Sequence, residues 1–241
     1  MFHHGRVTTT LGPEARALIA AVRESLAEHA DPETAAQQQR YMKSAMPYRG
    51  LKTPLLRSVL RPLVAAHPLT DRAQWEGTVR ALWDQAAYRE ERYAAEVVAG
   101  DRRYWGHQDP GCLDLYEHLV VTGAWWDHVD LIAIHLIGPI QRSSRPALDA
   151  TLRSWSTDSN LWRRRTAIIH QVGAGAAIDR NLLVDCIVPN LADREFFIRK
   201  AIGWALRQHA RIEPDWVREF VTAHEDRLSG LSRREATKHL G

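Results

Sequence analysis

Apolar residues recur every three to four positions along almost the whole chain, which is the spacing of one face of an α-helix. Alternating apolar and polar runs bounded by hairpin turns are missing from the sequence. The pattern therefore predicts an all-α protein. Proline-containing pairs and one Ser-Asn pair mark the expected helix starts, which are Gly12-Pro13, Asp31-Pro32, Thr53-Pro54, Ser159-Asn160 and Pro214-Asp215.

Short interruptions separate these segments, and no low-complexity linker divides them. The expected turns are Gly100-Asp101, Asp109-Pro110-Gly111, Gly138-Pro139 and residues 173–175. The pattern amounts to about a dozen helices of roughly 10 to 15 residues with short connections, which is typical of stacked helical hairpins. We therefore expect residues 1–241 to form a single repeat domain.

Three residues fit the period near 40 residues that such hairpin repeats show. Trp126, Arg165 and Trp204 are separated by 39 residues and again by 39, and each is expected early in a helix. Equal positions of successive hairpins face the same side of a repeat array, so these side chains are predicted to line one concave surface. A chance coincidence of spacing is the alternative.

Charge is distributed unevenly along the chain, whose net charge is +3 and whose pI is about 9.0. From Arg163 to the C-terminus there are 14 of the 32 basic residues but only 10 of the 29 acidic residues. This excess favours a polyanionic partner, although solvated helix faces would give the same asymmetry. Nine tryptophans are too many for packing to be their only use, so some are expected to face a ligand.

Cysteine usage and hydropathy point to a soluble protein of the cytoplasm. Cys112 and Cys186 lie far apart in apolar segments, which predicts buried thiols rather than a disulfide and favours a reducing compartment. The longest apolar stretch, residues 131–140, is too short to span a bilayer, and the N-terminus has no signal-peptide pattern.

Several chemistries are disfavoured because their motifs are absent from the sequence. The 12 histidines form no HExxH motif, and no cysteine pair has the spacing of zinc ligands. P-loop, GxGxxG and GxSxG motifs are absent as well. We therefore expect a protein that uses no metal and no cofactor.

Trp126 and Asp130 are four residues apart on a predicted helix, which makes them neighbours on one face. An aromatic ring beside a carboxylate suits a positively charged ligand. A core tryptophan with a solvated carboxylate is the alternative, but Arg165 and Trp204 at repeat-equivalent positions favour a site.

A run of three arginines, residues 163–165, suits contact with a phosphate backbone because arginine forms bidentate contacts with phosphate. Further basic residues continue this bias, namely Arg199, Lys200, Arg207, Arg211, Arg233, Arg234 and Lys238. For each of them a solvated helix face is the alternative.

Seven ordered segments between Tyr41 and His239 resemble the bacterial alkylpurine DNA glycosylases built from HEAT-like repeats, the AlkD family. The segments are Tyr41-Met42-Lys43, Gly50-Leu51-Lys52-Thr53-Pro54, Leu82-Trp83-Asp84, residues 125–130, Ser159-Asn160-Leu161-Trp162, residues 195–204 and residues 232–236. The chain departs from the family at Arg163 and Arg164, where relatives tend to be less basic. Residues 1–30 lie outside the part that the resemblance covers.

The resemblance implies a HEAT-like repeat solenoid with a concave DNA-binding face. It implies a monofunctional DNA glycosylase that hydrolyses the N-glycosidic bond of cationic N3- or N7-alkylated purines, such as 3-methyladenine and 7-methylguanine, in base excision repair. The catalytic residues that carry over are Asp130, Trp126 and Trp204. The DNA contacts that carry over are Tyr41, Thr53, Arg165 and Arg207, to which the basic run and its continuation add Arg164 and Lys200.

The chemistry that the resemblance implies suits these residue types. An alkylated purine already carries positive charge, so the enzyme needs mainly to stabilise the oxocarbenium-like sugar, a task for one fixed carboxylate. Asp130 would do this and orient the water, while Trp126 and Trp204 pack against deoxyribose. Arg165 would pin a phosphate and keep Asp130 ionised. The family works from the sugar side of the lesion, which would tolerate bulky adducts.

Two other classes of function stay open at this point. One is a HEAT-like repeat protein that binds unusual DNA structures without excising a base, and the other is a helical scaffold for protein partners. Retention of Asp130 and both tryptophans favours the enzyme. We expect a monomer that acts on duplex DNA, associates with the nucleoid when bound to it and has no membrane partner.

Overall fold

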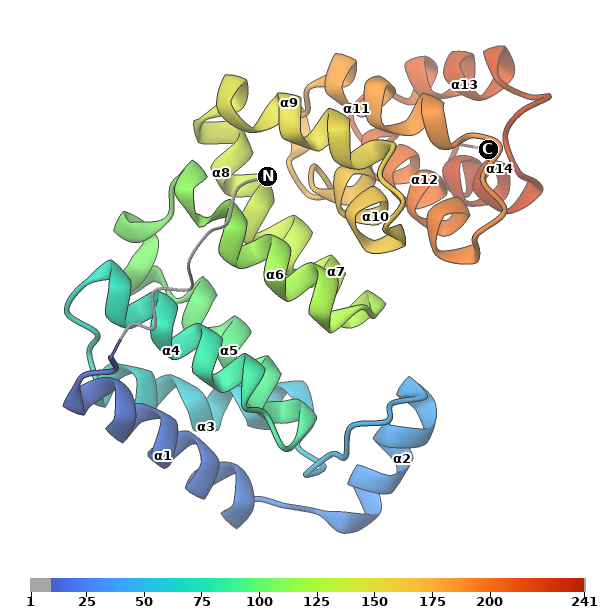
Figure 1. Cartoon of the computed structure of the whole chain (residues 1–241). Coiled ribbons are helices and arrows are strands. Elements are labelled where there is room, and N and C mark those ends of the chain that lie inside the picture. The colour runs from blue at the N-terminus through green and yellow to red at the C-terminus, as the bar shows by residue number, and fades with distance from the viewer. Residues whose placement is uncertain (1–9, 241) are drawn as a thin grey trace. The chain divides into compact units, whose positions relative to one another are not determined.

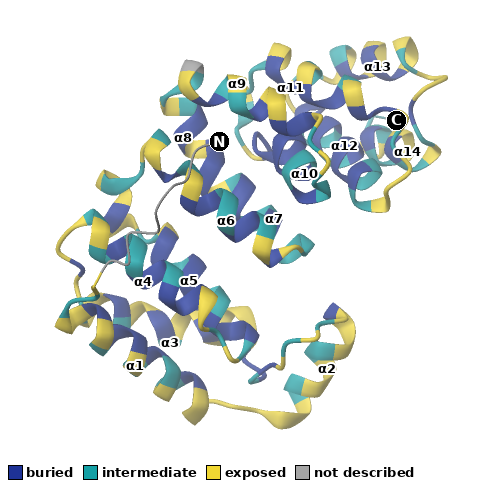
Figure 2. Ribbon diagram, in the orientation of Figure 1, coloured by how far each residue is buried: buried dark blue, intermediate teal, exposed yellow. Residues whose placement is uncertain are grey.

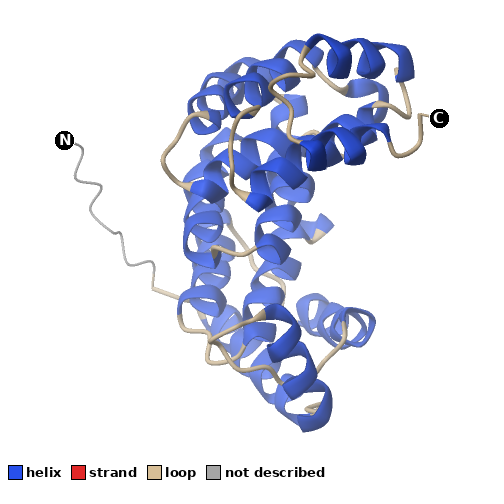
Figure 3. Cartoon of the chain, turned by 90° about the vertical axis from the view of Figure 1, so that its right-hand side faces the viewer, coloured by secondary structure: helices blue, strands red, loops and turns tan. Residues whose placement is uncertain are grey.

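The structure, a computed structural model, describes residues 10–240. Within that range it contains fourteen α-helices, four short 3₁₀ helices, one π-helical segment and no strand (Figure 3). The prediction of an all-α protein is confirmed.

The described residues form two compact units, one ending at His107 and the other beginning at Gln108. In Figure 1 the first unit runs from blue to green and the second from green to red. Segments of one repeat array and separate domains both give such units, so the single domain stays a prediction.

The first unit is built around four helices that pack against one another: α1 (Pro13–Glu28), α3 (Thr53–Ala66), α4 (Arg72–Asp84) and α5 (Arg89–Gly100). A 3₁₀ helix, η1 (Arg102–His107), ends the unit. The remaining helix, α2 (Pro32–Met42), buries only Met42. Its polar surface is therefore left exposed (Figure 2).

A buried carboxylate holds the loop between α2 and α3. Glu90 is fully buried and accepts backbone N–H groups from Arg49 (2.8 Å), Gly50 (2.8 Å) and Leu51 (3.2 Å). Gly50 has a φ of +97°, and any Cβ there would collide with the carbonyl oxygen of Asp31. Only glycine fits this turn without strain, so the ends of α2 and α3 are fixed relative to each other.

The second unit stacks its C-terminal helices in two rows (Figure 1). One row contains α9 (Arg145–Ser156), α11 (Arg180–Ile187) and α13 (Pro214–Ala223); the other contains α10 (Leu161–Ile169), α12 (Phe196–His209) and α14 (Gly230–Thr237). The unit begins with η2 (Pro110–Cys112), α6 (Leu113–Gly123) and α7 (Trp126–Leu131), and it also contains the 3₁₀ helices η4 (Gly175–Ala177) and η5 (Val188–Asn190). Alternation of the rows is the packing of stacked helical hairpins.

All five predicted helix starts are confirmed. Four helices begin with proline in their first turn, at Pro13, Pro32, Thr53-Pro54 and Pro214. The fifth, α10, has Asn160 as its N-cap, and the amide oxygen accepts the N–H groups of Trp162 (2.9 Å) and Arg163 (3.2 Å).

The turn predicted at Gly138-Pro139 is wrong. A π-helical segment, η3 (Ile132–Ile137), follows α7 directly and continues into α8 (Gly138–Ser143). Pro139 is tolerated because it lies in the first turn of α8. Gly138 is needed for close packing, since a Cβ there would collide with the carbonyl oxygen of His170.

Buried residues line the faces between helices in both units (Figure 2). Cys112 and Cys186 are buried thiols, as predicted, and burial raises the pKa of Cys186 to about 12. Among residues 10–240, no helix is long and apolar enough to cross a membrane.

Candidate functional site

Helix α7 carries the first pair of candidate residues. Trp126 is its first residue and Asp130 its fifth, so the two side chains lie one turn apart on the same face. Both residues are partly exposed rather than sealed in the core. The sequence therefore anticipated correctly that an indole and a carboxylate share a helix face open to solvent.

Arg165 holds the carboxylate of Asp130 from the neighbouring helix α10. Its Nε and Nη2 atoms donate to the two carboxylate oxygens at 2.7 and 2.8 Å. Its Nη1 donates to the carbonyl oxygen of Phe197 at 2.6 Å. The Arg165 side chain is only 4% exposed, whereas that of Asp130 is 16% exposed. Asp130 is thus fixed from the protein side while part of its carboxylate faces solvent.

Burial raises the pKa of Asp130 above its ordinary value, and the nearby charge of Asp127 adds to the rise. The hydrogen bonds and charge of Arg165 oppose this shift. Because both carboxylate oxygens accept hydrogen bonds from the guanidinium, the geometry is that of the ionised form. Arg165 therefore favours ionised Asp130, as expected, but burial is the larger influence on the pKa.

An aromatic cluster supports this ion pair, and its contribution was missed at the sequence level. Phe197 packs against Trp125 and Trp162 with ring centroids 5.5 and 5.1 Å apart. The guanidinium carbon of Arg165 lies 5.9 Å from the centre of the Phe197 ring. The available signal was the Phe196-Phe197 pair inside a segment that resembles the AlkD family. The cluster restrains the residue whose carbonyl binds Arg165.

Trp204 lies on α12 and packs partly against the apolar core of the second unit. Neither Trp126 nor Trp204 makes a ring contact with another described residue, in contrast to Trp125. Helix α10 packs against both α7 and α12. The helix that carries Arg165 therefore lies beside the helix of Trp126 and beside the helix of Trp204.

The expectation that the three repeat-spaced residues each lie early in a helix is wrong for Trp204. Trp126 is the first residue of its helix, Arg165 the fifth and Trp204 the ninth. Each of these residues therefore lies four positions further into its helix than the one before it. Because four residues are close to one helical turn, the helix face is nearly preserved.

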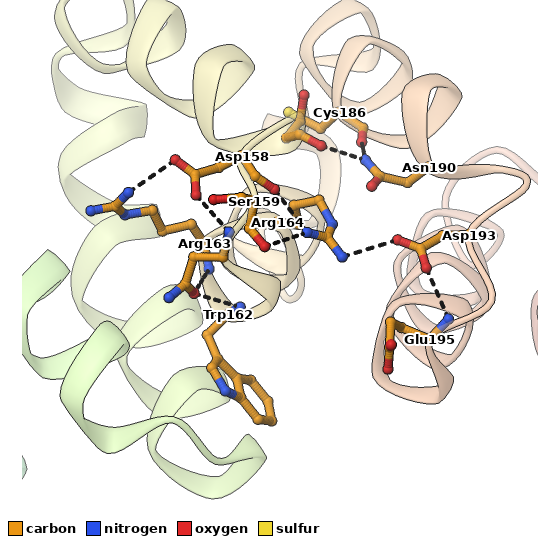
Figure 4. A network of polar contacts seen from close by, with 11 residues as sticks. Asp158, Ser159, Trp162, Arg163, Arg164, Cys186, Asn190, Asp193 and Glu195 are labelled. Atoms are coloured by element: carbon orange, nitrogen blue, oxygen red, sulfur yellow. Dashed lines mark hydrogen bonds and ion pairs between the residues drawn. The ribbon is translucent and has the colours of Figure 1, made fainter.

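Arg164 is engaged within the protein rather than left free (Figure 4). It donates to the carbonyl oxygens of Asp158 (2.7 Å) and Ser159 (3.1 Å). It also donates to a carboxylate oxygen of Asp193 at 3.2 Å. The side chain thus links the loop before α10 to the loop before α12.

Each arginine of the run at residues 163–165 forms an ion pair inside the second unit. The pairs are Arg163 with Glu117 and Asp158, Arg164 with Asp193, and Arg165 with Asp130. Contact of Arg164 and Arg165 with DNA stays a prediction, and it would have to use the donors that these pairs leave over.

Lys200 and Arg207 share one partner, Glu235 of α14. Lys200 binds a carboxylate oxygen at 2.7 Å, and Arg207 binds the other. The hydrogen bond from Lys200 is the main reason why the pKa of Glu235 is lowered. Both cations are partly exposed, so their predicted DNA contacts stay compatible with this pairing.

The two remaining candidates lie in the first unit. Tyr41, near the end of α2, is 77% exposed, and Thr53 is the exposed first residue of α3. Their predicted DNA contacts stay predictions.

Within residues 10–240 no group of three or more His, Cys, Asp or Glu side chains could hold a metal ion.

Comparisons with known proteins agree with this architecture. The family model described as DNA alkylation repair enzyme matches residues 22–240. A solved structure described as a predicted DNA alkylation repair enzyme from Enterococcus faecalis is 28% identical in sequence, and the match covers 88% of this chain and 97% of that chain with a TM-score of 0.78. No curated protein matches the chain.

Proposed function

Because the chain belongs to the family of DNA alkylation repair enzymes, we propose that it is a monofunctional DNA glycosylase. Its substrates are cationic N3- or N7-alkylated purines in duplex DNA, and it hydrolyses the bond between the base and deoxyribose. The observation that carries the proposal is the partly exposed carboxylate of Asp130, held in place by the buried guanidinium of Arg165.

Bond cleavage in this proposal proceeds from the charge on the base. The bond between sugar C1′ and the purine nitrogen breaks, and its electron pair neutralises the cationic purine. Positive charge then develops on the sugar, where the fixed carboxylate of Asp130 stabilises it. A preorganised carboxylate does so without the reorganisation that water would need.

Water completes the reaction at C1′. Its oxygen bonds to C1′, and its proton passes to the carboxylate of Asp130 or to solvent. The raised pKa of Asp130 supports this role because it makes the carboxylate a better proton acceptor than an ordinary aspartate. Asp130 therefore orients the water as well as stabilising the sugar.

The two indoles bind the sugar in this proposal. Trp126 and Trp204 are both partly exposed, so part of each indole is accessible to a ligand. Indole faces carry the negative end of the ring quadrupole and attract a developing cation. All three catalytic candidates belong to one unit of one chain, so the proposal needs no second subunit.

The test is release of base from alkylated duplex DNA under single-turnover conditions, with the products identified by mass spectrometry. Wild-type protein is expected to release 7-methylguanine or 3-methyladenine, and adducts of bulky alkylators extend the panel. Asp130→Asn is expected to lower the rate about 10²-fold or more, because the developing charge loses its partner. Asp127→Asn removes the same charge from the same helix and is expected to change the rate only a few-fold.

Two outcomes would contradict the proposal. Undiminished release by Asp130→Asn would remove Asp130 from the mechanism. Binding of duplex DNA without base release from any alkylated substrate would favour a binding protein instead. A protein scaffold would show no steep loss of DNA affinity with rising salt.

A further inference from the structure

A pocket of about 400 Å³ lies at the starts of α12 and α14. Its polar lining consists of Asp193, Arg194, Arg199, Arg227 and Ser229. At ~30 Å³ per water its volume holds roughly a dozen water molecules, so a phosphate group fits with room to spare.

The charge of this pocket is strongly positive because its one carboxylate is already neutralised. Asp193 accepts the backbone N–H of Glu195 at 2.8 Å and binds Arg164 at 3.2 Å. Figure 4 shows both contacts of Asp193. The lining therefore contains three arginines and no unpaired carboxylate. This excess of positive charge suits an anion.

Two of these arginines lack partners within the described part of the chain. The Nε atom of Arg199 is buried and has no acceptor there, and Arg194 is exposed without an acceptor for its side chain. Arg227 is tethered through one nitrogen to the carbonyl oxygen of Val188 at 3.1 Å. The guanidinium charges of Arg194 and Arg199 are therefore not matched by acceptors of the described residues, which leaves them available to an anion.

Helix geometry adds to the same effect. The pocket includes Ser229, the N-cap of α14, and Asp193 and Arg194 immediately precede the N-cap of α12. Helix N-termini carry partial positive charge and unpaired N–H groups, which favour phosphate. Here they reinforce guanidinium groups that would attract an anion by themselves.

The chain also connects this pocket to the Asp130 site. Arg164, which binds Asp193, is adjacent in sequence to Arg165, which binds Asp130. Arg199 lies two residues after Phe197, whose carbonyl oxygen accepts a hydrogen bond from Arg165. The pocket is therefore linked to the Asp130 site through two adjacent arginines of α10.

We infer that this pocket binds one backbone phosphate of duplex DNA through Arg194, Arg199 and Arg227. The inference rests on the proposed function, since it takes duplex DNA as the ligand. The pocket is open to solvent. This suits a phosphate within a DNA strand, because the strand continues on both sides of it. It anchors the strand by charge and carries no information about base sequence.

The test measures binding of a short undamaged duplex at a series of salt concentrations. Each neutralised phosphate contributes about 0.9 to the slope of log affinity against log salt. Arg199→Ala and Arg194→Ala are each expected to weaken binding at least about five-fold and to reduce the slope by up to about one. Arg199→Lys keeps the charge and is expected to retain most of the slope.

Arg218→Ala is the matched control. Arg218 is an exposed arginine of α13 that pairs with Asp215, and it does not line the pocket. Its loss removes the same charge without touching the pocket, so the slope should stay at the wild-type value. Should Arg199→Ala fail to fold, the exposed position of Arg194 keeps the test available.

A second arm identifies the phosphate. Phosphates of the duplex are replaced one at a time by uncharged methylphosphonates. At one position the methylphosphonate should weaken DNA binding by the wild-type protein but not by Arg199→Ala, because the variant has already lost its contact with that phosphate. The inference would be overturned if the salt slopes of Arg199→Ala and Arg194→Ala equalled that of Arg218→Ala. Equal sensitivity of Arg199→Ala and wild type at every position would overturn it as well.

Free phosphate is distinguished by comparing inorganic phosphate with chloride at matched ionic strength. If Arg199→Ala changed only the competition by inorganic phosphate and not the DNA slope, the pocket would be a site for a free anion and the inference would fail. Base release from alkylated duplex by the wild type is scored separately. Failure of the pocket therefore leaves the proposed glycosylase standing, and failure of base release is recognised on its own.

Discussion

Asp130 and Glu235 are both carboxylates of the second unit that bind basic side chains, but their surroundings differ. Asp130 is held by a single guanidinium that is almost fully buried, and burial raises its pKa. Glu235 binds Lys200 and Arg207, which are more exposed, and the hydrogen bond from Lys200 lowers its pKa. Ion-paired carboxylates thus have opposite pKa shifts, because desolvation is the largest influence on Asp130 and the hydrogen bond from Lys200 is the largest influence on Glu235.

The difference separates two roles. A carboxylate that holds its proton more tightly than usual, yet is fixed in its ionised form, suits the work of a catalytic group. A carboxylate with a lowered pKa between two partly exposed cations mainly moderates the positive charge of a surface. The following predictions test whether this comparison holds, beginning with the largest expected effect and ending with the smallest.

Arg165→Ala is expected to have the largest effect. It removes both hydrogen bonds to Asp130 and leaves a partly buried carboxylate without a counter-charge, which costs about 3–5 kcal/mol of unfolding free energy. Loss of carboxylate orientation should lower single-turnover base release about 10²-fold. Chemical denaturation and base release measure the two effects.

Arg165→Lys separates positioning from folding. Lysine keeps the charge but cannot donate in a bidentate manner, so base release should fall while most of the stability is retained. The acid limb of the rate profile should also move to higher pH. The hydrogen bonds of Arg165 lower the pKa of Asp130, and lysine retains only part of that effect. Wild-type rates in both Arg165 variants would break the comparison.

Gly203→Ala tests how Glu235 is brought to α12. A Cβ at Gly203 would lie 2.5 Å from the Cβ of Glu235 and 2.8 Å from the carbonyl oxygen of Ser232, so α12 and α14 would have to move apart. Overpacking of this kind typically costs about 1–3 kcal/mol. Gly106→Ala is the control, since nothing lies within 4 Å of a Cβ there. Equal unfolding free energies for the two variants would contradict the prediction.

The pH dependence of base release sharpens the comparison further. Because the pKa of Asp130 is raised from its ordinary 3.8, the rate should fall as pH decreases through a value above 3.8. Each pH unit below that pKa should cost about ten-fold, since the ionised fraction falls by that factor. An acid limb at or below the ordinary aspartate value would contradict this assignment.

Stability must be followed in the same buffers because of His170. Burial lowers the pKa of His170 to about 4 from 6.5, so the folded state favours the neutral ring. Its contribution to stability is complete above about pH 6.5 and is lost as pH falls towards 4, which amounts to about 3 kcal/mol. Denaturation curves at each pH separate this loss from the titration of Asp130.

Glu235→Gln is expected to have the smallest effect. It frees Lys200 and Arg207 from a negative partner, so duplex DNA should bind about two- to five-fold more tightly at low salt if these cations face phosphates. Glu225→Gln removes a carboxylate that pairs with exposed Arg233 and serves as the control. Unchanged DNA affinity in Glu235→Gln would remove Lys200 and Arg207 from the DNA-binding surface.

Local signals explain which elements could be predicted. Helix starts were recognised because proline and Asn160 act within one turn of their own position. The turn expected at Gly138-Pro139 was wrong because glycine also serves close packing, and the neighbouring carbonyl of His170 is 32 residues away. The spacing of Trp126 and Asp130 on one helix face needed only helical periodicity.

The amino-acid sequence alone determined the helical class, the helix starts and the shared face of Trp126 and Asp130, because these depend on residues within a few positions of one another. Only the tertiary structure decided which charges are paired. Arg165 and Asp130 are 35 residues apart, as are Lys200 and Glu235, so a count of basic residues could not show that their charges are already matched. Burial raises the pKa of Asp130 and a hydrogen bond from another helix lowers that of Glu235, and both arise only once the helices have packed.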